Sequence, residues 1–271
     1  MPIGSHENLD QLIETIILGI IQGLAEWLPI SSTGHLRLAE HIMGLDVPVL
    51  FDVALHVGTL IVVLFFFRRE VWKMASALVH FDLESEDGKA VPLIIVGVIP
   101  TLVIGLILGT LTGGLFGDIV LIAIAFILCG STLFAVRFSE ERTEEIRYST
   151  AIMMGVAQGL AILPGLSRSG LTIAVALLLG VKRRKAFSFS FLISVPAILG
   201  ALAFTSFTQL AELAAAGLEW SELLAGVFAA ILVGYCVLKL LQKIIMRKKL
   251  YLFAFYCWTL GAVIILISGI L

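Results

Sequence analysis

"GIIQGLAEWLPISSTG", residues 19–34, and "GVAQGLAILPGLSRSG", residues 155–170, are the two stretches that decide the fold of this chain. Aligned without gaps, they are identical at seven of 16 positions: Gly19, Gln22, Gly23, Leu24, Ala25, Ser31 and Gly34. Two unrelated stretches of this length would share roughly one or two residues, so the match indicates an internal duplication. The two copies are 136 residues apart, and the same offset places Phe51 on Phe187.

The rest of the chain has the composition of a membrane protein. Of its 271 residues, 59% are hydrophobic and 14% are charged, whereas an ordinary soluble domain is about half apolar and about a quarter charged. The net charge of −2 provides no basic field, so no nucleic-acid partner is expected. Six apolar stretches are long enough to cross about 30 Å of hydrocarbon. They lie near 50–67, 92–108, 119–137, 186–204, 222–243 and 251–270.

Two further apolar regions, 10–44 and 149–181, are each broken at the centre. The breaks fall at 28–32 and 164–170, where proline or glycine is expected to end a helix. Each half of these regions is expected to be too short to span the bilayer, which predicts two re-entrant helix hairpins.

The Trp residues are candidates for the interfacial belts of the membrane; they are Trp27, Trp72, Trp220 and Trp258.

These features predict an all-α polytopic membrane protein built as an inverted-topology repeat. The whole chain, 1–271, forms a single membrane domain. Repeat one covers about 9–137 and repeat two about 147–271, and each half contains one re-entrant hairpin and three transmembrane helices. Because three crossings are an odd number, the second half is inverted relative to the first. In transporters with this architecture the site lies at the midplane between the halves.

The positive charges predict the orientation in the cell membrane. If the N-terminus starts on one side, the other side receives four segments that hold 16 of the 18 Lys and Arg residues. These segments are 68–91, 137–149, 181–186 and 239–250. The connections on the first side, 109–118 and 205–221, hold none. Lys and Arg accumulate on the cytoplasmic side, so both termini are expected outside. The two remaining cations, Arg37 and Arg168, lie in the broken regions.

Polar side chains at membrane depth gather around sites or aqueous cavities, because burying them in lipid is costly. In the first break, Glu26 precedes a group of helix-capping residues, and His35 lies close enough to Ser32 for its imidazole to approach the hydroxyl. In the second break, the guanidinium of Arg168 lies between the hydroxyl residues Ser167 and Ser169. The remaining polar residues of the two breaks are Ser31, Thr33 and Thr172.

Two half-helix N-termini would then point at one spot, and with a guanidinium there the spot suits a phosphate group. A serine with a histidine and a carboxylate nearby would allow nucleophilic phosphoryl chemistry.

Structural interpretations stand beside these functional ones. Ser31 and Thr33 can serve as helix caps alone, and Glu26 can form a purely structural ion pair with Arg168. His56 and His80 are expected to be packed or interfacial side chains. The roles of Arg37 and Asp52 are left open. For Arg37 the alternatives are contact with the outer headgroups or with a second phosphate. For Asp52 they are exposure to solvent or support of the site.

The segments "QGLAEWLPISSTGH" and "PGLSRSGLT" resemble the two signature motifs of the undecaprenyl-diphosphate phosphatase family, also called the bacitracin-resistance family. The first segment matches a [Glu/Gln]-x-x-x-Glu element followed by Pro-x-Ser-Ser-Thr-Gly-His. The second matches a Pro-Gly-x-Ser-Arg-Ser-x-x-Thr element. The resemblance extends over essentially the whole chain, since length, repeat spacing and span pattern also agree.

The resemblance implies an enzyme that removes the terminal phosphate of a polyprenyl diphosphate and regenerates the monophosphate carrier used in cell-wall synthesis. By position, Ser32 would be the nucleophile, His35 its general base or acid, and Arg168 the phosphate clamp. A covalent phosphoenzyme on His35 in place of Ser32 is the alternative. Glu26 would orient the histidine or hold a divalent cation, Mg²⁺ or Ca²⁺. The supporting substrate-binding residues would be Ser31, Thr33, Ser167, Ser169 and Thr172.

Gln22 occupies a motif position that is Glu in many members of the family. Its amide carbonyl is a weaker ligand than a carboxylate, which leaves its part in metal binding open and makes Glu26 the better candidate.

The resemblance places the diphosphate between the two breaks, in a site that opens to the outer face. A polyprenyl-phosphate flippase or an anion transporter is the alternative, because inverted repeats with midplane half-helices are also the architecture of carriers. A carrier, however, has no need for the Ser32, His35 and Glu26 group. A homodimer is compatible with the sequence.

Overall fold

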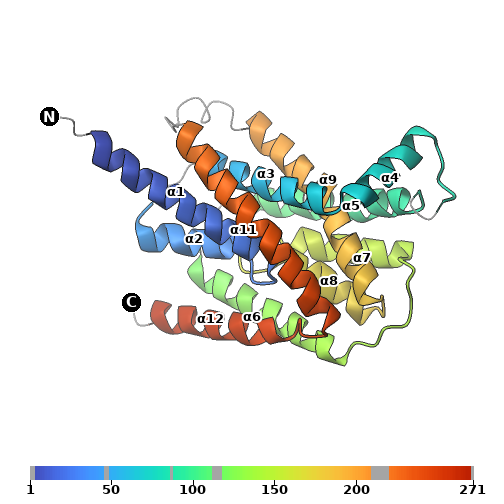
Figure 1. Cartoon of the computed structure of the whole chain (residues 1–271). Coiled ribbons are helices and arrows are strands. Elements are labelled where there is room, and N and C mark those ends of the chain that lie inside the picture. The colour runs from blue at the N-terminus through green and yellow to red at the C-terminus, as the bar shows by residue number, and fades with distance from the viewer. Residues whose placement is uncertain (1–3, 46–48, 86–87, 112–117, 209–219, 270–271) are drawn as a thin grey trace.

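The computed structural model describes residues 4–45, 49–85, 88–111, 118–208 and 220–269, and within these ranges the chain is helical with no β-strand (Figure 1). A single isolated bridge joins Thr143 and Val181. The helices are α1 (Gly4–Trp27), α2 (Ser32–Met43), α3 (Val49–Phe66), α4 (Arg68–Val79), α5 (Ala90–Leu111), α6 (Ile119–Ala135), η2 (Val136–Phe138), α7 (Tyr148–Leu160), α8 (Arg168–Leu178), α9 (Arg183–Thr208), α11 (Trp220–Met246) and α12 (Leu252–Ser268).

Both broken regions are helix pairs joined by a short turn, as predicted. Figure 1 shows α1 running from the end of the molecule that holds both termini toward its middle, with α2 returning toward that end. The pair α7 and α8 does the same from the opposite end. Helix α1 differs from the prediction in its length. It has 24 residues, about 36 Å at 1.5 Å per residue, so it is not too short to span.

Four of the helices are long and apolar enough to cross a membrane: α5, α6, α9 and α11. A fifth candidate is α3 together with α4, two helices bent by 80° at their junction. The sequence had assigned the start of 68–91 to a connecting segment, but Arg68–Val79 is helical. The last expected span, α12, has 17 residues. The chain is therefore a multi-pass membrane protein with at least these four candidate spans.

The two hairpins pack against helices that are distant in the sequence. Helix α1 lies along α11, α7 lies along α5, and α6 lies along α12. A Cβ atom on Gly19 would be 2.2 Å from the backbone oxygen of Gly226, and one on Gly155 would be 1.8 Å from that of Gly97. Gly19 and Gly155 are the first identical pair of the duplicated stretches. The same close helix approach therefore recurs in both halves.

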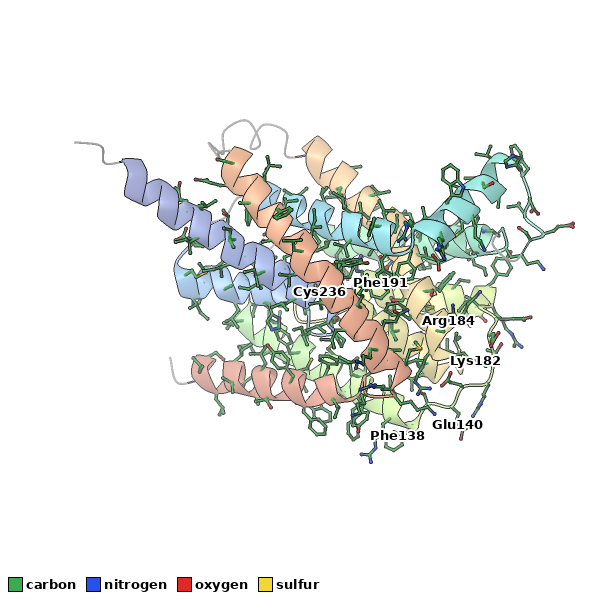
Figure 2. All side chains as sticks on the ribbon, in the orientation of Figure 1. Phe138, Glu140, Lys182, Arg184, Phe191 and Cys236 are labelled. Atoms are coloured by element: carbon green, nitrogen blue, oxygen red, sulfur yellow. The ribbon has the colours of Figure 1, made fainter. Side chains whose placement is uncertain are left out.

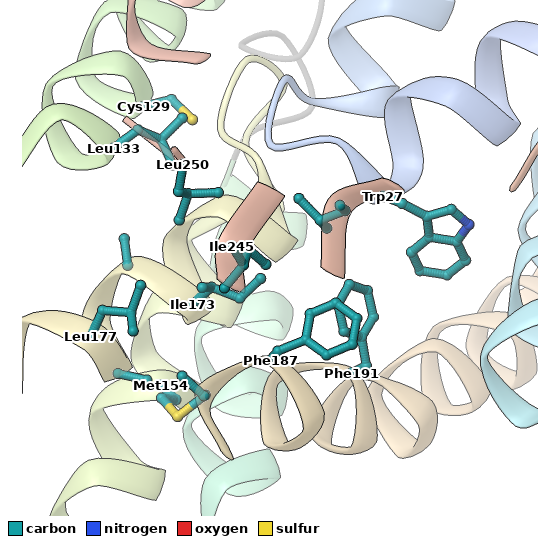
Figure 3. Close-up of a cluster of buried hydrophobic side chains, with 14 of the residues drawn as sticks. Trp27, Cys129, Leu133, Met154, Ile173, Leu177, Phe187, Phe191, Ile245 and Leu250 are labelled. Atoms are coloured by element: carbon teal, nitrogen blue, oxygen red, sulfur yellow. The ribbon is translucent and has the colours of Figure 1, made fainter. Parts of the chain in front are cut away.

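An aromatic cluster fills the centre of the molecule beside the first break. Figure 3 shows Phe187 and Phe191 of α9 with their rings together and Trp27 on the side of Phe191. The Trp27 ring is fully buried and meets Phe191 edge-on, with the centroids 5.4 Å apart. Trp27 is therefore a core residue and not part of an interfacial belt, because the turn after α1 carries it into the protein interior.

The connections at the end opposite the termini are rich in charge and are fastened to one another. Figure 2 labels Glu140, Lys182 and Arg184 at this end. The backbone N–H of Arg142 donates to Gly180 O at 2.7 Å, and Lys182 Nζ donates to Glu144 Oε1 at 2.6 Å. These contacts tie the connection that precedes α7 to the turn that precedes α9.

Candidate active site

A cavity of about 300 Å³ lies where the two helix breaks meet. Part of its wall is polar and comes from Glu26, Ser31, Ser32, Thr33, Asp52, His56, Thr101, Gln158, Ser167 and Arg168. The other part is apolar and comes mainly from Ala25, Val53, Ala161, Ile162, Leu166, Ala197, Ile198, Ala201 and Leu202. A polar pocket that continues into an apolar wall suits an amphiphilic ligand with a charged head and a hydrocarbon tail.

The Glu26 carboxylate is the centre of the polar wall. Arg168 forms a salt bridge with Oε1, and Ser32 Oγ donates to Oε2 at 2.6 Å. The amide of Gln22 also donates to Oε2, at 3.3 Å. Glu26 is buried, and a buried charge is tolerated only when it is paired and hydrogen-bonded. These three donors therefore hold the carboxylate in one position, between the two breaks.

The same local structure places Ser32 and Arg168. Ser31 and Ser167 are the N-caps of α2 and α8, and their hydroxyls accept from the backbone N–H groups of Gly34 (3.3 Å) and Gly170 (3.2 Å). Ser32 and Arg168 are consequently the first residues of the returning helices. The N-terminal ends of both helices face the cavity, where their partial positive charge favours an anion.

Two hydrogen bonds join the breaks directly. Ser31 Oγ also accepts from the backbone N–H of Gly165 at 3.0 Å, and Ser169 Oγ donates to the backbone oxygen of Trp27 at 3.1 Å. Ser31 has a left-handed backbone, with φ of 70°, which turns the chain sharply into α2. The prediction that the two breaks meet is confirmed, and these contacts fix their relative position.

His35, expected from sequence spacing to approach the Ser32 hydroxyl, has its ring nitrogens on other partners, and the Ser32 hydroxyl donates to Glu26. The Nδ1 atom of His35 is 2.8 Å from Ser31 O, and its Nε2 atom is 2.6 Å from Tyr256 Oη on α12. The ring also stacks on Tyr256 and meets Phe126 edge-on. Both nitrogens are engaged away from the cavity, because packing against α6 and α12 determines the orientation of the side chain.

The structure brings a different histidine into the cavity. His56 of α3 lines the wall, and its Nε2 atom is 3.7 Å from Glu26 Oε2. The sequence alone predicts a packed or interfacial side chain at His56. The available signal was its spacing four residues after Asp52, whose backbone oxygen lies 2.7 Å from His56 Nδ1.

Not every predicted substrate-binding residue reaches the cavity. Ser31, Thr33 and Ser167 line it, but Ser169 and Thr172 do not. Thr172 is fully buried and bonds to the backbone oxygen of Arg168 (2.8 Å) and to Ser190 Oγ (2.5 Å). Ser169 and Thr172 are buried behind the wall, where their hydrogen bonds hold the first turn of α8 and with it Arg168.

Arg37 and Asp52, whose roles were left open, belong to one network. Arg37 donates to Glu40 Oε2 at 2.8 Å and to Asp52 Oδ2 at 3.3 Å. Asp52 lines the cavity, and Arg37 is outside the lining.

Gln158 also lines the cavity, although the sequence did not point to it. It is the residue equivalent to Gln22 in the aligned repeats. Its amide donates to Thr101 Oγ1 at 3.2 Å.

Gln22 and Glu26, the pair that the family resemblance implies for a divalent cation, are bound to each other and to further protein donors. Both oxygens of Glu26 already accept from protein donors, and Gln22 turns its amide nitrogen toward that carboxylate. The carbonyl oxygen of Gln22 is buried with no partner. Among the residues that the structure describes, no three His, Cys, Asp or Glu side chains gather where they could hold a metal ion.

A serine on a carboxylate, a nearby imidazole and a guanidinium at two helix N-termini are the groups needed to bind and transfer a phosphoryl group. The fold and the site thus define a multi-pass membrane protein with a cavity whose polar wall carries a carboxylate, a serine, a histidine and an arginine. The chain belongs to the family described as "Bacitracin resistance protein BacA", whose sequence model matches residues 15–263.

Relatives in this family are similar to the chain over nearly its full length. The undecaprenyl-diphosphatase of Carboxydothermus hydrogenoformans is 41% identical over 263 residues, covering 94% of this chain and 97% of the relative. The undecaprenyl-diphosphatase of Halothermothrix orenii is 39% identical over 267 residues, covering 96% and 99%. That of Desulforapulum autotrophicum is 38% identical over 274 residues, covering 94% and 98%.

Proposed function

We propose that this protein is an integral-membrane phosphatase that removes the terminal phosphate of undecaprenyl diphosphate and returns the monophosphate carrier to cell-wall synthesis. The names of its relatives support this substrate. The observation in this chain that carries the proposal is the convergence of Ser32 and Arg168, from different breaks, on the Glu26 carboxylate. A flippase or anion transporter is not favoured, since a carrier has no need for a serine held on a carboxylate.

In the proposed reaction, the diphosphate enters the polar part of the cavity and the isoprenoid chain lies along the apolar part. Arg168 moves its guanidinium from Glu26 to the phosphate, because an oxyanion with several acceptor atoms can engage more of its donors. Glu26 then becomes the proton acceptor for Ser32. Ser32 Oγ attacks the terminal phosphorus, its proton passes to Glu26, and the polyprenyl monophosphate leaves.

A divalent cation, Mg²⁺ or Ca²⁺, remains part of the proposal as the counter-ion that accompanies the diphosphate. Mg²⁺ in proteins is commonly held by one or two carboxylates together with substrate phosphates. No residue of this chain is assigned to the ion, and no step above passes through it.

We also propose that the chain is one membrane domain with inverted repeats at about 9–137 and 147–271, re-entrant hairpins, and a site open to the outer face. The opposed hairpins and the charge at the end opposite the termini support this topology. It is tested in a Cys236→Ser background. An impermeant maleimide should label E140C only from the cytoplasm and H41C only from outside. The reverse pattern would contradict the orientation.

The activity is tested with the purified full-length protein in detergent with Mg²⁺ and undecaprenyl diphosphate. The expected result is release of one inorganic phosphate per substrate, with the monophosphate as the lipid product. The Ser32→Ala variant serves as the control for contaminating phosphatases. A well-folded protein that releases no phosphate, or a Ser32→Ala variant with full activity, would refute the proposal.

A further inference from the structure

His56 is held in the cavity in a defined orientation. Its Nδ1 atom lies 2.7 Å from the backbone oxygen of Asp52, and a carbonyl can only accept a hydrogen bond. In the neutral ring the proton therefore resides on Nδ1, which leaves the Nε2 lone pair as an acceptor. Nε2 is 3.7 Å from Glu26 Oε2, which is longer than a hydrogen bond. The lone pair is thus free to accept a proton in the cavity.

The proposed function requires a second proton acceptor beside Ser32. After the first half of the reaction, Glu26 carries the serine proton and cannot accept another. Arg168 has no acceptor atom. Asp52 is bound by Arg37 through Oδ2, and its Oδ1 atom has no hydrogen-bond partner among the described residues but is buried out of reach of a water molecule. Among the titratable side chains that line the cavity, His56 is the group left with an available acceptor atom.

We infer that His56 is the catalytic base that activates the water which hydrolyses phosphorylated Ser32. This inference rests on the proposed function and extends it. Water attacks the phosphorus, one water proton passes to His56 Nε2, and the bond between phosphorus and Ser32 Oγ breaks. The proton held by Glu26 returns to Ser32 Oγ. Hydrogen phosphate leaves, and His56 then releases its proton to solvent, so that one proton is liberated per substrate.

The charged groups around His56 are consistent with this step. Glu26 and Arg168 lie across the cavity, and Asp52 with its partners Arg37 and Glu40 lies on the near side. When Glu26 gives up its proton to Ser32, its carboxylate regains a negative charge next to the newly protonated imidazole. The two charges then form an ion pair, which stabilises the products of the step before phosphate leaves.

The test compares His56→Asn and His56→Gln with the wild type, as full-length proteins in detergent. Asn keeps an amide donor near the Nδ1 position and Gln places an amide near Nε2, but neither supplies a base. In both, steady-state phosphate release should fall by about 10²- to 10⁴-fold, the usual contribution of a general base. The diagnostic result is accumulation of phosphoserine at Ser32, measured by acid quench and mass spectrometry of the intact chain and its peptides.

His80 provides a matched control. Its Nδ1 atom also lies near a backbone oxygen four residues earlier, that of Ser76, at 2.8 Å, but it is exposed and does not line the cavity. His80→Gln should therefore retain wild-type turnover. His35→Gln loses the contact with Tyr256 that steadies the first break. It should slow formation of the phosphoenzyme without accumulating it.

The possible outcomes separate the two proposals. If the wild type releases no phosphate, the proposed function fails. If the wild type is active and a folded His56 variant turns over at the wild-type rate, the assignment of His56 fails while the phosphatase stands. Slow turnover without phosphoserine in both variants also overturns the assignment, because a base needed only for the second step cannot block the first. Thermal unfolding of each variant establishes that it is folded.

Discussion

The two helix breaks share a backbone design and differ in the side chains placed on it. In each, a serine caps the returning helix and accepts from a glycine N–H three residues later, at Ser31 and Gly34 in the first break and at Ser167 and Gly170 in the second. One residue after each cap, at equivalent positions, stand Ser32 and Arg168. The duplicated feature is therefore the N-terminus of the returning helix. Its backbone N–H groups attract an anion whichever side chain stands at the first helical residue.

The chemistry comes from the positions at which the copies diverged. Glu26 in the first break corresponds to Ile162 in the second, under the 136-residue offset. Ile162 contributes to the apolar wall of the same cavity. One break thus supplies the carboxylate and the nucleophile, and the other supplies the cation and part of the surface for the tail. A symmetric scaffold gains an asymmetric site when equivalent positions carry complementary groups.

The largest expected effect on activity comes from removing Ser32 or Arg168, the two different residues at equivalent positions of the breaks. Ser32→Ala and Arg168→Ala should each lower phosphate release by about 10³-fold or more, since one removes the nucleophile and the other the phosphate clamp. Thr33→Val, in the same cavity, should lose less than about tenfold. Turnover of undecaprenyl diphosphate by purified protein measures all three. Similar losses at Thr33 and Arg168 would show that the divergence has no special role.

The next effect is on stability and concerns the close helix contacts made by Gly19 and Gly155 in the two halves. Gly155→Ala and Gly19→Ala would each force a Cβ against a backbone oxygen, so each should lower the free energy of unfolding by about 3 kcal/mol. Gly109 in α5 has open space where a Cβ would be built, and Gly109→Ala should be neutral or slightly stabilising. Thermal unfolding in detergent gives the ranking. If one half tolerates the alanine and the other does not, the approach is not equivalent in the two halves.

A smaller effect distinguishes the two caps. Ser31 accepts from Gly34 and also from Gly165 across the breaks, whereas Ser167 accepts from Gly170 and contacts Ser169 in its own break. Ser31→Ala should therefore cost about 2 kcal/mol of stability and Ser167→Ala about 1 kcal/mol. Chemical denaturation of the two variants, side by side, provides the comparison. Equal costs would mean that the link between the breaks contributes nothing.

The smallest effect concerns the repeated glutamine. Gln22 contacts the carboxylate of Glu26, and Gln158 lines the cavity beside Thr101. Gln22→Leu should lower kcat, and Gln158→Leu should raise KM, each by about two- to tenfold, the effect of one neutral hydrogen bond. The Mg²⁺ concentration for half-maximal activity should be unchanged in Gln22→Leu. A large increase in that concentration would make Gln22 a metal ligand after all.

Local signals in the sequence were sufficient to locate the breaks and the charged end of the molecule. Proline, glycine and hydroxyl residues determine where helices stop and start, because they act through their own backbone and the next turn. The duplication implied that the two breaks face each other, and the ion pair of Glu26 with Arg168 was the structural alternative. The hydrogen bond from Ser32 to Glu26 was not predicted. By contrast, the helix α4 and the full length of α1 were not predicted, since their polar residues resembled those of connections.

The two histidines show where reasoning from sequence spacing fails. His35 lies three residues after Ser32, a spacing that places two side chains on one face of a helix. Its ring nevertheless turns to Tyr256, 221 residues away in the sequence, because that contact satisfies Nε2. His56 had only Asp52, four residues earlier, as a polar signal, yet the packing of α3 brings its imidazole to Glu26. Rotamers at such sites depend on which helix is packed alongside.

The amino-acid sequence by itself determined that the chain is a helical membrane protein, where its helices break, and which family it resembles. Composition and helix-ending residues act locally and need no knowledge of the packing. Tertiary structure alone decided which polar groups share the cavity, leaving His35, Ser169 and Thr172 outside it and placing His56, Asp52 and Gln158 in its wall. These placements depend on contacts between helices distant in the sequence, whose geometry no local pattern encodes.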